Sequence, residues 1–295
     1  MTDAPSPAAV PPALGGLSAI AARYDVVLCD VWGVVHNGIM AFPGAVDALV
    51  RMRARGARVV LITNAPRPAS SIARQLDGLK VPHEAYDAIV SSGDLTRAAL
   101  EARPGAQVFH IGPPRDIATF TGLDVVQVGQ DAAEIAVCTG LFDDETETPA
   151  DYTDRLAALK ARAVPMLCAN PDIVVARGNT LIYCAGAIAH AYEGMGGEVV
   201  YFGKPYPAIY DAALALAAAA GAGSVPRERV LAIGDALHTD MAGAARTGID
   251  GLFIADGIHA EELGALDGAE PDSAALTRLF TGHAHPLGVM ARLAW

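Results

Sequence analysis

The side chains best suited to chemistry in this sequence are carboxylates, a lysine and a hydroxyl, and each follows a short apolar run. In chain order they are Asp30 in LCDVWG, Thr63 and Asn64 in LITN, Lys204 in FGKPYP, and Asp235 and Asp240 in GDALHTD. Two carboxylates at neighbouring strand ends, together with a backbone carbonyl and water, form the all-oxygen octahedral set that Mg²⁺ prefers. The pattern therefore predicts a Mg²⁺ site that contains Asp30 and Asp235.

Asp30 is the predicted nucleophile at this site. An aspartate with an unperturbed pKa of ~3.9 is ionised at neutral pH, and it can attack phosphorus once the negative charge of the target is neutralised. The Thr63 hydroxyl, the Asn64 backbone N–H and the Lys204 ammonium can then hold the oxygens of the transferred phosphoryl group. These residue types, in this order, predict phosphoryl chemistry on an anionic substrate.

Buried parallel strands are expected to position these side chains. Residues 24–29 (YDVVLC) form an apolar run rich in β-branched residues without clean alternation, which is typical of a parallel strand buried on both faces. The carboxyl ends of such strands form the ligand-binding edge of open α/β sheets, so Asp30 should face a crevice. The repeated alternation of such runs with helical segments predicts an α/β fold with a parallel sheet and right-handed crossovers.

The alternation is interrupted once, which predicts two domains. Residues 18–91 and 195–295 are assigned to a core domain, and residues 92–194 to a smaller inserted α/β domain with strands and helices of its own. Within the insertion, the sequence Thr148-Pro149-Ala150-Asp151 fits a capping box at the start of a helix. The strand expected at 198–202 is assigned to the core, and residues 1–17 are expected to form a flexible N-terminal arm.

The composition of the chain argues against some classes of binding partner. The 295 residues carry 21 basic and 33 acidic side chains, a net charge of -12, without the basic cluster that binding to nucleic acid requires. The first residues lack a basic region followed by a long apolar stretch, so neither a signal peptide nor a membrane anchor is expected. The cysteines have no metal-ligand spacing and should be reduced core residues, which favours a cytoplasmic location. They are Cys29, Cys138, Cys168 and Cys184.

Taken together and in this order, the motifs resemble those of the haloacid dehalogenase superfamily, class IIA. This group includes nitrophenyl-phosphatase-like, nucleotide and sugar phosphatases. The resemblance implies a Rossmann-like core and a C2-type cap inserted between Asn64 and Lys204. It also implies that the reaction passes through an aspartyl-phosphate intermediate on Asp30.

The resemblance further implies a role for each acidic residue. Mg²⁺ would be held by Asp30, Asp235 and the backbone carbonyl of Trp32. Asp240 would brace the metal or Lys204.

A stretch of the insertion, CANPD at 168–172, resembles the asparagine-proline-aspartate sequence that these caps direct toward the active site. By this resemblance, Asn170 and Asp172 are candidate substrate contacts. An asparagine-proline-aspartate sequence is also an ordinary turn, so a structural role explains the same residues.

Trp32 departs from the phosphatase pattern, which usually has a second aspartate two residues after the nucleophile to protonate the leaving group. General acid–base help is worth ~10² to 10⁴ in rate, so hydrolysis should favour aryl or acyl phosphates, whose leaving groups need little protonation. His36, six residues after Asp30 and with an unperturbed pKa of ~6.5, is the nearest candidate for a substitute acid. A histidine in a turn is equally explained by a structural role.

Three functions stay open on the sequence. The first is a Mg²⁺-dependent phosphatase of small phosphorylated metabolites. The second is a catalytically weak or inactive protein that binds a phosphorylated ligand in a regulatory role. The third is other aspartate chemistry, because haloacid dehalogenases carry an aromatic residue at the position of Trp32, although they work without Mg²⁺ and the carboxylates of GDALHTD favour a metal. The sequence does not determine the substrate or the oligomeric state, for which a homodimer is one option.

Overall fold

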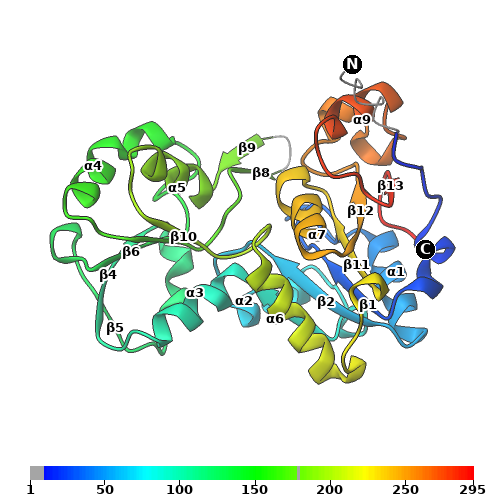
Figure 1. The fold of residues 1–295 in the computed structure, drawn as a ribbon, viewed down its shortest axis with the longest axis horizontal. Helices are drawn as coiled ribbons and strands as arrows, with labels where there is room; N and C mark the ends of the chain where they lie inside the picture. Colours follow the sequence, from blue (N-terminus) through cyan, green and yellow to red (C-terminus); the bar gives the residue numbers. More distant parts are fainter. Residues whose placement is uncertain (1–9, 178–179) are drawn as a thin grey trace, which may run out of the picture. The chain divides into compact units, whose positions relative to one another are not determined.

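The computed structural model describes residues 10–177 and 180–295, which form two compact units (Figure 1). The first unit contains the chain up to Leu61 together with Leu79–Ala88 and Ala213–Trp295. The second unit contains Ile62–Gly78 and Ile89–Ala212. The predicted α/β class, with a parallel-sheet core and a further sheet, is confirmed.

A six-stranded sheet has the strand order β13-β12-β11-β1-β2-β3. Its strands are β1 (Val26–Cys29), β2 (Arg58–Thr63), β3 (Ala88–Ser91), β11 (Val230–Gly234), β12 (Asp250–Ile254) and β13 (Gly288–Met290). β1 pairs in parallel with β2 and β11, and β12 pairs in parallel with β11 and β13. Every residue of β1 and β11 is buried, as their continuous apolar runs predict. Because β1 and β11 are parallel neighbours, the residues that follow them leave the sheet at the same edge.

The second unit contains a five-stranded parallel sheet in the order β10-β7-β6-β4-β5. Its strands are β4 (Ala106–Ile111), β5 (Val125–Gln127), β6 (Ile135–Cys138), β7 (Met166–Cys168) and β10 (Val199–Tyr201). Two further strands, β8 (Val174–Arg177) and β9 (Thr180–Tyr183), pair in antiparallel fashion. The core of this unit packs around side chains that include Ile111, Cys138, Tyr152, Met166 and Tyr192.

Helices connect the strands in both units. They are α1 (Pro43–Ala54), α2 (Ala69–Gly78), α3 (Ser92–Glu101), α4 (Thr153–Ala161), α5 (Ala185–Gly194), α6 (Pro207–Ala217), α7 (Ala242–Thr247), α8 (Ala260–Leu263) and α9 (Ser273–Phe280). The helix expected after Thr148 begins as a 3-10 turn that leads into α4, and Thr148 and Asp151 form the predicted capping box. In the part of the chain that the structure describes, no helix is both long and apolar enough to cross a membrane.

The assignment of the strand at 198–202 to the core sheet is wrong. This strand is β10, and it pairs in parallel with β7 at the edge of the five-stranded sheet. The second sheet therefore extends past residue 194, where the insertion was expected to end. A three-residue parallel strand fits either sheet by its own sequence, and only the pairing partner distinguishes the two.

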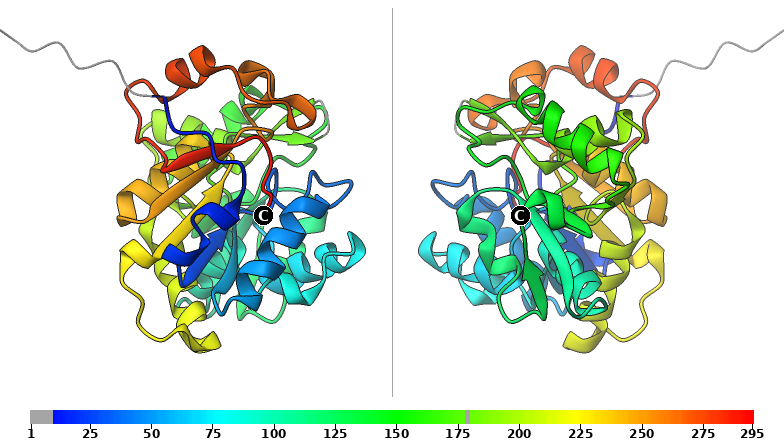
Figure 2. Two further views of the ribbon diagram at one scale, coloured as in Figure 1. Left: turned by 90° about the vertical axis from the view of Figure 1, so that its right-hand side faces the viewer. Right: turned by 90° about the vertical axis from the view of Figure 1, so that its left-hand side faces the viewer.

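Residues 10–17 run beside β13 (Figure 2). The Leu14 N–H donates to the Val289 carbonyl at 2.8 Å, and the Val289 N–H donates to the Pro12 carbonyl at 2.9 Å. These bonds pair the outer side of β13, which would otherwise be an open sheet edge. The rest of the expected N-terminal arm, residues 1–9, lies outside the described residues.

Asp87 fixes the start of β3 against α1 and β2 through hydrogen bonds to both elements. Its carboxylate accepts two hydrogen bonds from Arg53, at 2.8 and 2.9 Å, and one from the Val59 N–H at 2.8 Å. Burial alone would raise the pKa of Asp87, but the hydrogen bonds from Arg53 and Val59 and the charges of Arg53 and Arg58 outweigh it and lower the pKa. The ionised form is therefore the one that stabilises the fold.

Asp87→Asn is expected to lower the free energy of unfolding by about 2 kcal/mol at pH 7, because charge-assisted hydrogen bonds are lost. A carboxylate with a lowered folded-state pKa stabilises above its unfolded pKa of ~3.9 and loses that effect as the pH falls. The difference from wild type should therefore shrink below about pH 4. Urea unfolding at several pH values measures it. Asp47→Asn, which removes an exposed partner of Arg51 in α1, is the control and should change stability by less than about 0.5 kcal/mol.

Candidate active site

Three buried carboxylates meet at one edge of the six-stranded sheet. Asp30 follows β1, Asp235 follows β11, and Asp240 lies in the short helical turn Leu237–Met241 that comes next. One carboxylate oxygen from each residue lies within 4.8 Å of the other two. The three residues are only 6%, 6% and 3% exposed, in chain order. The structure thus brings together the side chains that the sequence placed at neighbouring strand ends.

Backbone atoms enclose two of these carboxylates closely. Asp235 Oδ2 accepts the Ile258 N–H at 2.8 Å, and an ideal Cβ added to Gly33 or Gly257 would lie 2.1 Å from the same oxygen. Gly33 also has a φ of +83°, which favours glycine independently of the close approach. Any larger residue at these positions would have to displace Asp235.

Asp240 is held in the same way. Its Oδ2 accepts the Ala236 N–H at 3.2 Å, and an ideal Cβ on Gly234 would lie 2.0 Å from its Cγ. The G-D-A-x-x-x-D spacing therefore has a direct structural reason: the glycine admits the second aspartate, and the alanine amide binds it.

This donor set fits a hard divalent cation. Three carboxylates buried so close together repel one another, and buried charge is costly unless it is paired or coordinates a metal. Carboxylate oxygens are the ligands that Mg²⁺ and Ca²⁺ select. Asp30, Asp235 and Asp240 could therefore hold such an ion.

Trp32 and His36 pack in the turn that follows Asp30. The two rings meet edge to face with their centroids 5.3 Å apart. An ideal Cβ on Gly38, whose φ is +85°, would lie 2.4 Å from Cη2 of Trp32, so the indole lies directly against the glycine backbone. A side chain at position 38 would occupy the space that the partly exposed Trp32 ring fills, so glycine is required there.

His36 is 2% exposed, and its Nδ1 accepts the Gly38 N–H at 2.9 Å. In the neutral ring the proton is therefore on Nε2. The Gly33 N–H donates to the His36 carbonyl at 2.8 Å, which closes the turn. His36 thus contributes both to the turn and to the placement of Trp32.

Thr63, Asn64 and Lys204 belong to the second unit and are 6%, 3% and 3% exposed. Asn64 Oδ1 accepts the Lys204 N–H at 2.7 Å, and Asn64 Nδ2 donates to the Lys204 carbonyl at 3.1 Å. Thr63 Oγ1 accepts the Ala65 N–H at 3.2 Å. The structure therefore brings Asn64 and Lys204, which are far apart in sequence, into direct contact.

The predicted substrate contacts of the CANPD sequence also lie in the second unit. Asn170 Oδ1 accepts the Asp172 N–H at 3.0 Å, as in an Asx-turn. Asp172 Oδ1 accepts a hydrogen bond from Asn64 Nδ2 at 2.9 Å. The ordinary-turn interpretation thus describes Asn170, while Asp172 reaches the segment that follows β2.

Three further residues contact these groups. The Ile258 amide binds Asp235, Ser92 Oγ donates to Asn64 Oδ1 at 3.4 Å, and Gly203 packs its backbone against Asn64. Of the three, only Ile258 could be predicted from local sequence, because it follows an apolar strand of the same strand–helix alternation as Asp30 and Asp235. The contacts of Ser92 and Gly203 depend on which segments meet in space.

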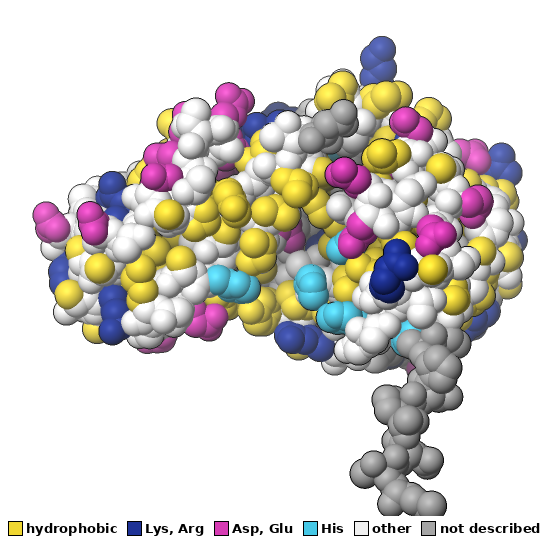
Figure 3. Space-filling model, turned by 90° about the horizontal axis from the view of Figure 1, so that it is seen from above, with side chains coloured by type: hydrophobic (Ala, Val, Ile, Leu, Met, Phe, Trp, Pro, Cys, Tyr) yellow, Lys and Arg dark blue, Asp and Glu magenta, His cyan; other side chains and the backbone are white. Residues whose placement is uncertain are grey.

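Figure 3 shows Lys and Arg side chains scattered over the visible face rather than gathered into one patch. With a net charge of -12, the chain must create positive potential for an anionic substrate locally. The buried Lys204 is a source of such potential.

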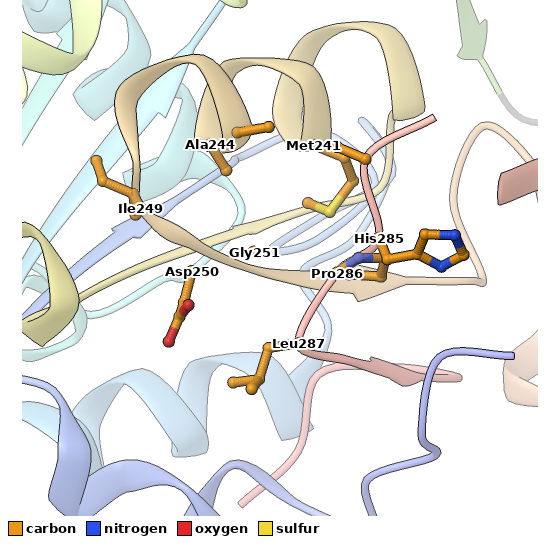
Figure 4. A pocket seen from close by; sticks show the side chains of 10 residues that line it. Met241, Ala244, Ile249, Asp250, Gly251, His285, Pro286 and Leu287 are labelled. Carbon is orange, nitrogen blue, oxygen red and sulfur yellow. The ribbon is translucent and has the colours of Figure 1, made fainter. Parts of the chain in front are cut away.

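A cavity of about 180 Å³ opens elsewhere in the first unit, beside α7 and the start of β12 (Figure 4). Its lining includes Met241, Ile249, Leu287 and Asp250. Asp250 begins β12 at the amino end of the sheet, opposite to the edge that carries Asp235, and its Oδ2 accepts a hydrogen bond from the Tyr24 hydroxyl at 2.6 Å. This cavity is therefore distinct from the acidic cluster.

Comparison with known proteins gives consistent results. Residues 27–126 match a family model described as haloacid dehalogenase-like hydrolase, and residues 201–278 match one described as HAD-hydrolase-like. The crystal structure of a hydrolase of the haloacid dehalogenase-like family from Brucella suis 1330 is 44% identical. It superposes with a TM-score of 0.84 and covers 94% of this chain and 98% of that chain.

Two comparisons concern glycerol phosphate phosphatase. D-glycerol 3-phosphate phosphatase of Mycobacterium tuberculosis is 28% identical over 82% of this chain, which spans 66% of the length of that relative. A crystal structure of glycerol phosphate phosphatase from the same organism, in complex with calcium, is 25% identical with a TM-score of 0.61. It covers 90% of this chain and 76% of that chain.

Proposed function

The chain belongs to the haloacid dehalogenase-like hydrolases, and we propose on that basis that it is a Mg²⁺-dependent phosphatase of small phosphorylated metabolites. The single observation that carries the proposal is the cluster of Asp30, Asp235 and Asp240, whose buried carboxylates approach one another within 4.8 Å. A relative crystallised with calcium supports a divalent ion. When bound there, Mg²⁺ would neutralise the phosphate charge that otherwise repels a carboxylate nucleophile.

Asp30 carries out the covalent step. One of its carboxylate oxygens attacks phosphorus, the bond from phosphorus to the ester oxygen breaks, and the alkoxide or phenoxide leaves with the bonding electrons and takes a proton from an acid or from water. Water then attacks the phosphorus of the aspartyl phosphate, and the bond from phosphorus to the Asp30 oxygen breaks. The electron pair returns to the Asp30 carboxylate, and the oxygen and protons of the water leave with inorganic phosphate. Asp30→Asn is the variant that tests this step.

Thr63, Asn64 and Lys204 are proposed to hold the phosphoryl oxygens, through the hydroxyl, the backbone N–H and the ammonium group respectively. Their burial supports this assignment. Water screens the charge of a lysine that is only 3% exposed weakly, so this charge acts strongly on neighbouring anionic groups. The Trp32 carbonyl is proposed as a further metal ligand.

Trp32 determines the preferred leaving group in this proposal. An indole cannot donate a proton as a carboxylic acid does, so an alkoxide leaving group is left without help. With Mg²⁺ present, kcat/KM for para-nitrophenyl phosphate or acetyl phosphate is expected to exceed that for a sugar phosphate by about 100-fold. Steady-state release of inorganic phosphate measures the ratio. Equal values across the three substrates would contradict the role given to Trp32.

The alternative is that His36 replaces the missing acid, and the same substrate pair tests it. To act as an acid, His36 must be doubly protonated, so its Nδ1 would give up the hydrogen bond that it accepts from the Gly38 N–H in the neutral form. If His36 protonates the leaving group, His36→Ala should slow sugar phosphate turnover more than para-nitrophenyl phosphate turnover. A uniform decrease would instead assign His36 to the structure of the turn.

A second candidate function follows from Trp32 alone. Without the usual acid, the chain could bind a phosphorylated ligand without turning it over. A binder would retain inorganic phosphate in calorimetry while releasing none from the aryl, acyl or sugar phosphates. Turnover of any of them that disappears in Asp30→Asn excludes this alternative.

A further inference from the structure

The side chain of Asn64 lies where four segments of the second unit meet. Its Oδ1 accepts hydrogen bonds from the Lys204 N–H at 2.7 Å and from Ser92 Oγ at 3.4 Å. Its Nδ2 donates to the Lys204 carbonyl at 3.1 Å and to Asp172 Oδ1 at 2.9 Å. An amide group has two N–H donors and two acceptor lone pairs, so this set uses the full hydrogen-bonding capacity of Asn64.

The paired bonds to Lys204 fix its backbone rather than its ammonium group. Donor and acceptor of one planar amide bind the N–H and the C=O of a single residue, which sets both the position and the direction of the chain there. Asn64 and Lys204 are both buried, so water does not replace these bonds readily. The Lys204 side chain therefore leaves from a backbone that Asn64 holds.

Gly203 shows how closely this arrangement is packed. An ideal Cβ at Gly203, whose φ is +121°, would lie 2.1 Å from Ser92 Oγ, 2.5 Å from Asn64 Oδ1 and 3.0 Å from Pro171 Cδ. The lysine segment thus contacts the segment after β2, the start of α3 and the Asn170–Asp172 turn at one point. These contacts have no room for a side chain.

We propose that Asn64 is a positioning residue that orients Lys204, and that Asp172 acts on Lys204 through Asn64 rather than on the substrate. The Asn170–Asp172 turn holds Asp172 in place through the Asx-turn bond and through the Gly186 N–H, which donates to the Asp172 carbonyl at 3.1 Å. The turn of the inserted region thereby becomes part of the support of the phosphate-binding lysine. This inference rests on the proposed function, because it takes Lys204 as the group that binds the phosphoryl oxygens.

Three variants separate this role from a substrate contact. Asn64→Asp keeps the shape of the side chain. It replaces the Nδ2 group, which donates to the Lys204 carbonyl and to the Asp172 carboxylate, with an oxygen that can only accept. Asp172→Asn keeps an oxygen that can accept from Asn64. The double variant Asn64→Asp with Asp172→Asn reverses the bond, because the new amide can donate to the new carboxylate. Thr96→Val is the control, since it removes the buried hydrogen bond from Thr96 Oγ1 to the Ser92 backbone carbonyl, at 2.9 Å, and leaves the side chains of Ser92, Asn64 and Asp172 unchanged.

Two readouts are measured on the full chain with Mg²⁺: the Kd for inorganic phosphate by calorimetry, and kcat and KM for para-nitrophenyl phosphate. Asn64→Asp is expected to weaken phosphate binding and lower kcat/KM by about 10- to 100-fold. Asp172→Asn should stay within about threefold of wild type, and the double variant should recover at least about tenfold over Asn64→Asp. Thr96→Val should lower the Tm while both readouts stay within about twofold.

The inference is overturned if the double variant is no better than Asn64→Asp, or if Asn64→Asp changes phosphate binding no more than Thr96→Val does. It is also overturned if Asp172→Asn alone raises KM by tenfold or more, which is the result expected of a direct substrate contact. Failure of the proposed function looks different: wild type would bind phosphate without turnover. The binding measurements would then still decide the role of Asn64.

Discussion

Asp30→Asn is expected to lower kcat for para-nitrophenyl phosphate by about 10⁴-fold or more, while the protein stays folded. An amide is a far weaker nucleophile than a carboxylate, so the proposed attack on phosphorus is lost. The change also removes one of the three charges that surround the proposed metal position. Phosphate release and circular dichroism on the same preparation separate loss of chemistry from loss of structure.

Asp25→Asn is the matched control for this variant. Asp25 lies five residues earlier in the same unit and is ion-paired with Arg229 at the surface, where its side chain is 46% exposed. Its replacement makes the same chemical change away from the acidic cluster and should alter kcat by less than about twofold. If Asp30→Asn kept a tenth or more of wild-type turnover, Asp30 would not be the nucleophile.

Removal of the metal, or of Asp235, is expected to lower kcat by about 10³-fold or more. The same change should act on stability in the opposite direction. Without a cation, the three buried carboxylates repel one another, so Asp235→Asn should raise the Tm of the chelator-treated protein. Mg²⁺ at roughly 100 times its Kd should raise the Tm of wild type by about 5 °C, and that of Asp235→Asn by much less.

Thermal unfolding with EDTA and then with added Mg²⁺ checks both parts of this expectation. Asp25→Asn, again the control, should show the full Mg²⁺-dependent shift. A wild-type Tm that does not respond to Mg²⁺, Mn²⁺ or Ca²⁺, together with full activity in EDTA, would show that the cluster holds no catalytic ion. Aspartate chemistry without a metal would then become the better description.

The strands that carry the acidic residues could be predicted from local sequence. β1 and β11 are unbroken apolar runs, each followed at once by an aspartate. Parallel pairing sends the ends of such strands to one edge whatever lies between them in the chain, so Asp30 and Asp235 could be placed together although 204 residues separate them. This prediction uses only the rule that parallel strands end at the same edge of a sheet, and it does not depend on side-chain packing.

The strands that were missed or misassigned are short and depend on distant partners. β10 has three residues and was placed in the wrong sheet, while β8 and β13 were not anticipated at all. β13 is defined by its pairing with β12 and with the segment around Leu14, which lies some 275 positions earlier in the sequence. Nothing local in a Gly-Val-Met sequence distinguishes such a strand from a loop.

The role of the Asn64 side chain shows the same limit at the candidate site. Its backbone N–H was selected because of the position after β2, a local property. Its side chain serves the backbone of Lys204 and the carboxylate of Asp172, which lie in segments more than 100 residues away. Such contacts follow from packing between segments, and only coordinates reveal them.

The buried cysteines allow the transient opening of each unit to be measured by thiol modification. Cys29 lies within β1 in the first unit, and Cys138, Cys168 and Cys184 lie in the second. None of the four forms a disulfide, and all are buried as predicted. Burial raises the pKa of the Cys138 thiol to about 12 and raises those of Cys168 and Cys184 as well, which keeps them in the unreactive thiol form. A maleimide reagent therefore modifies native protein only as fast as each unit transiently opens. Peptide mapping of the adducts over time would give the opening rate of each unit separately, without any engineered label.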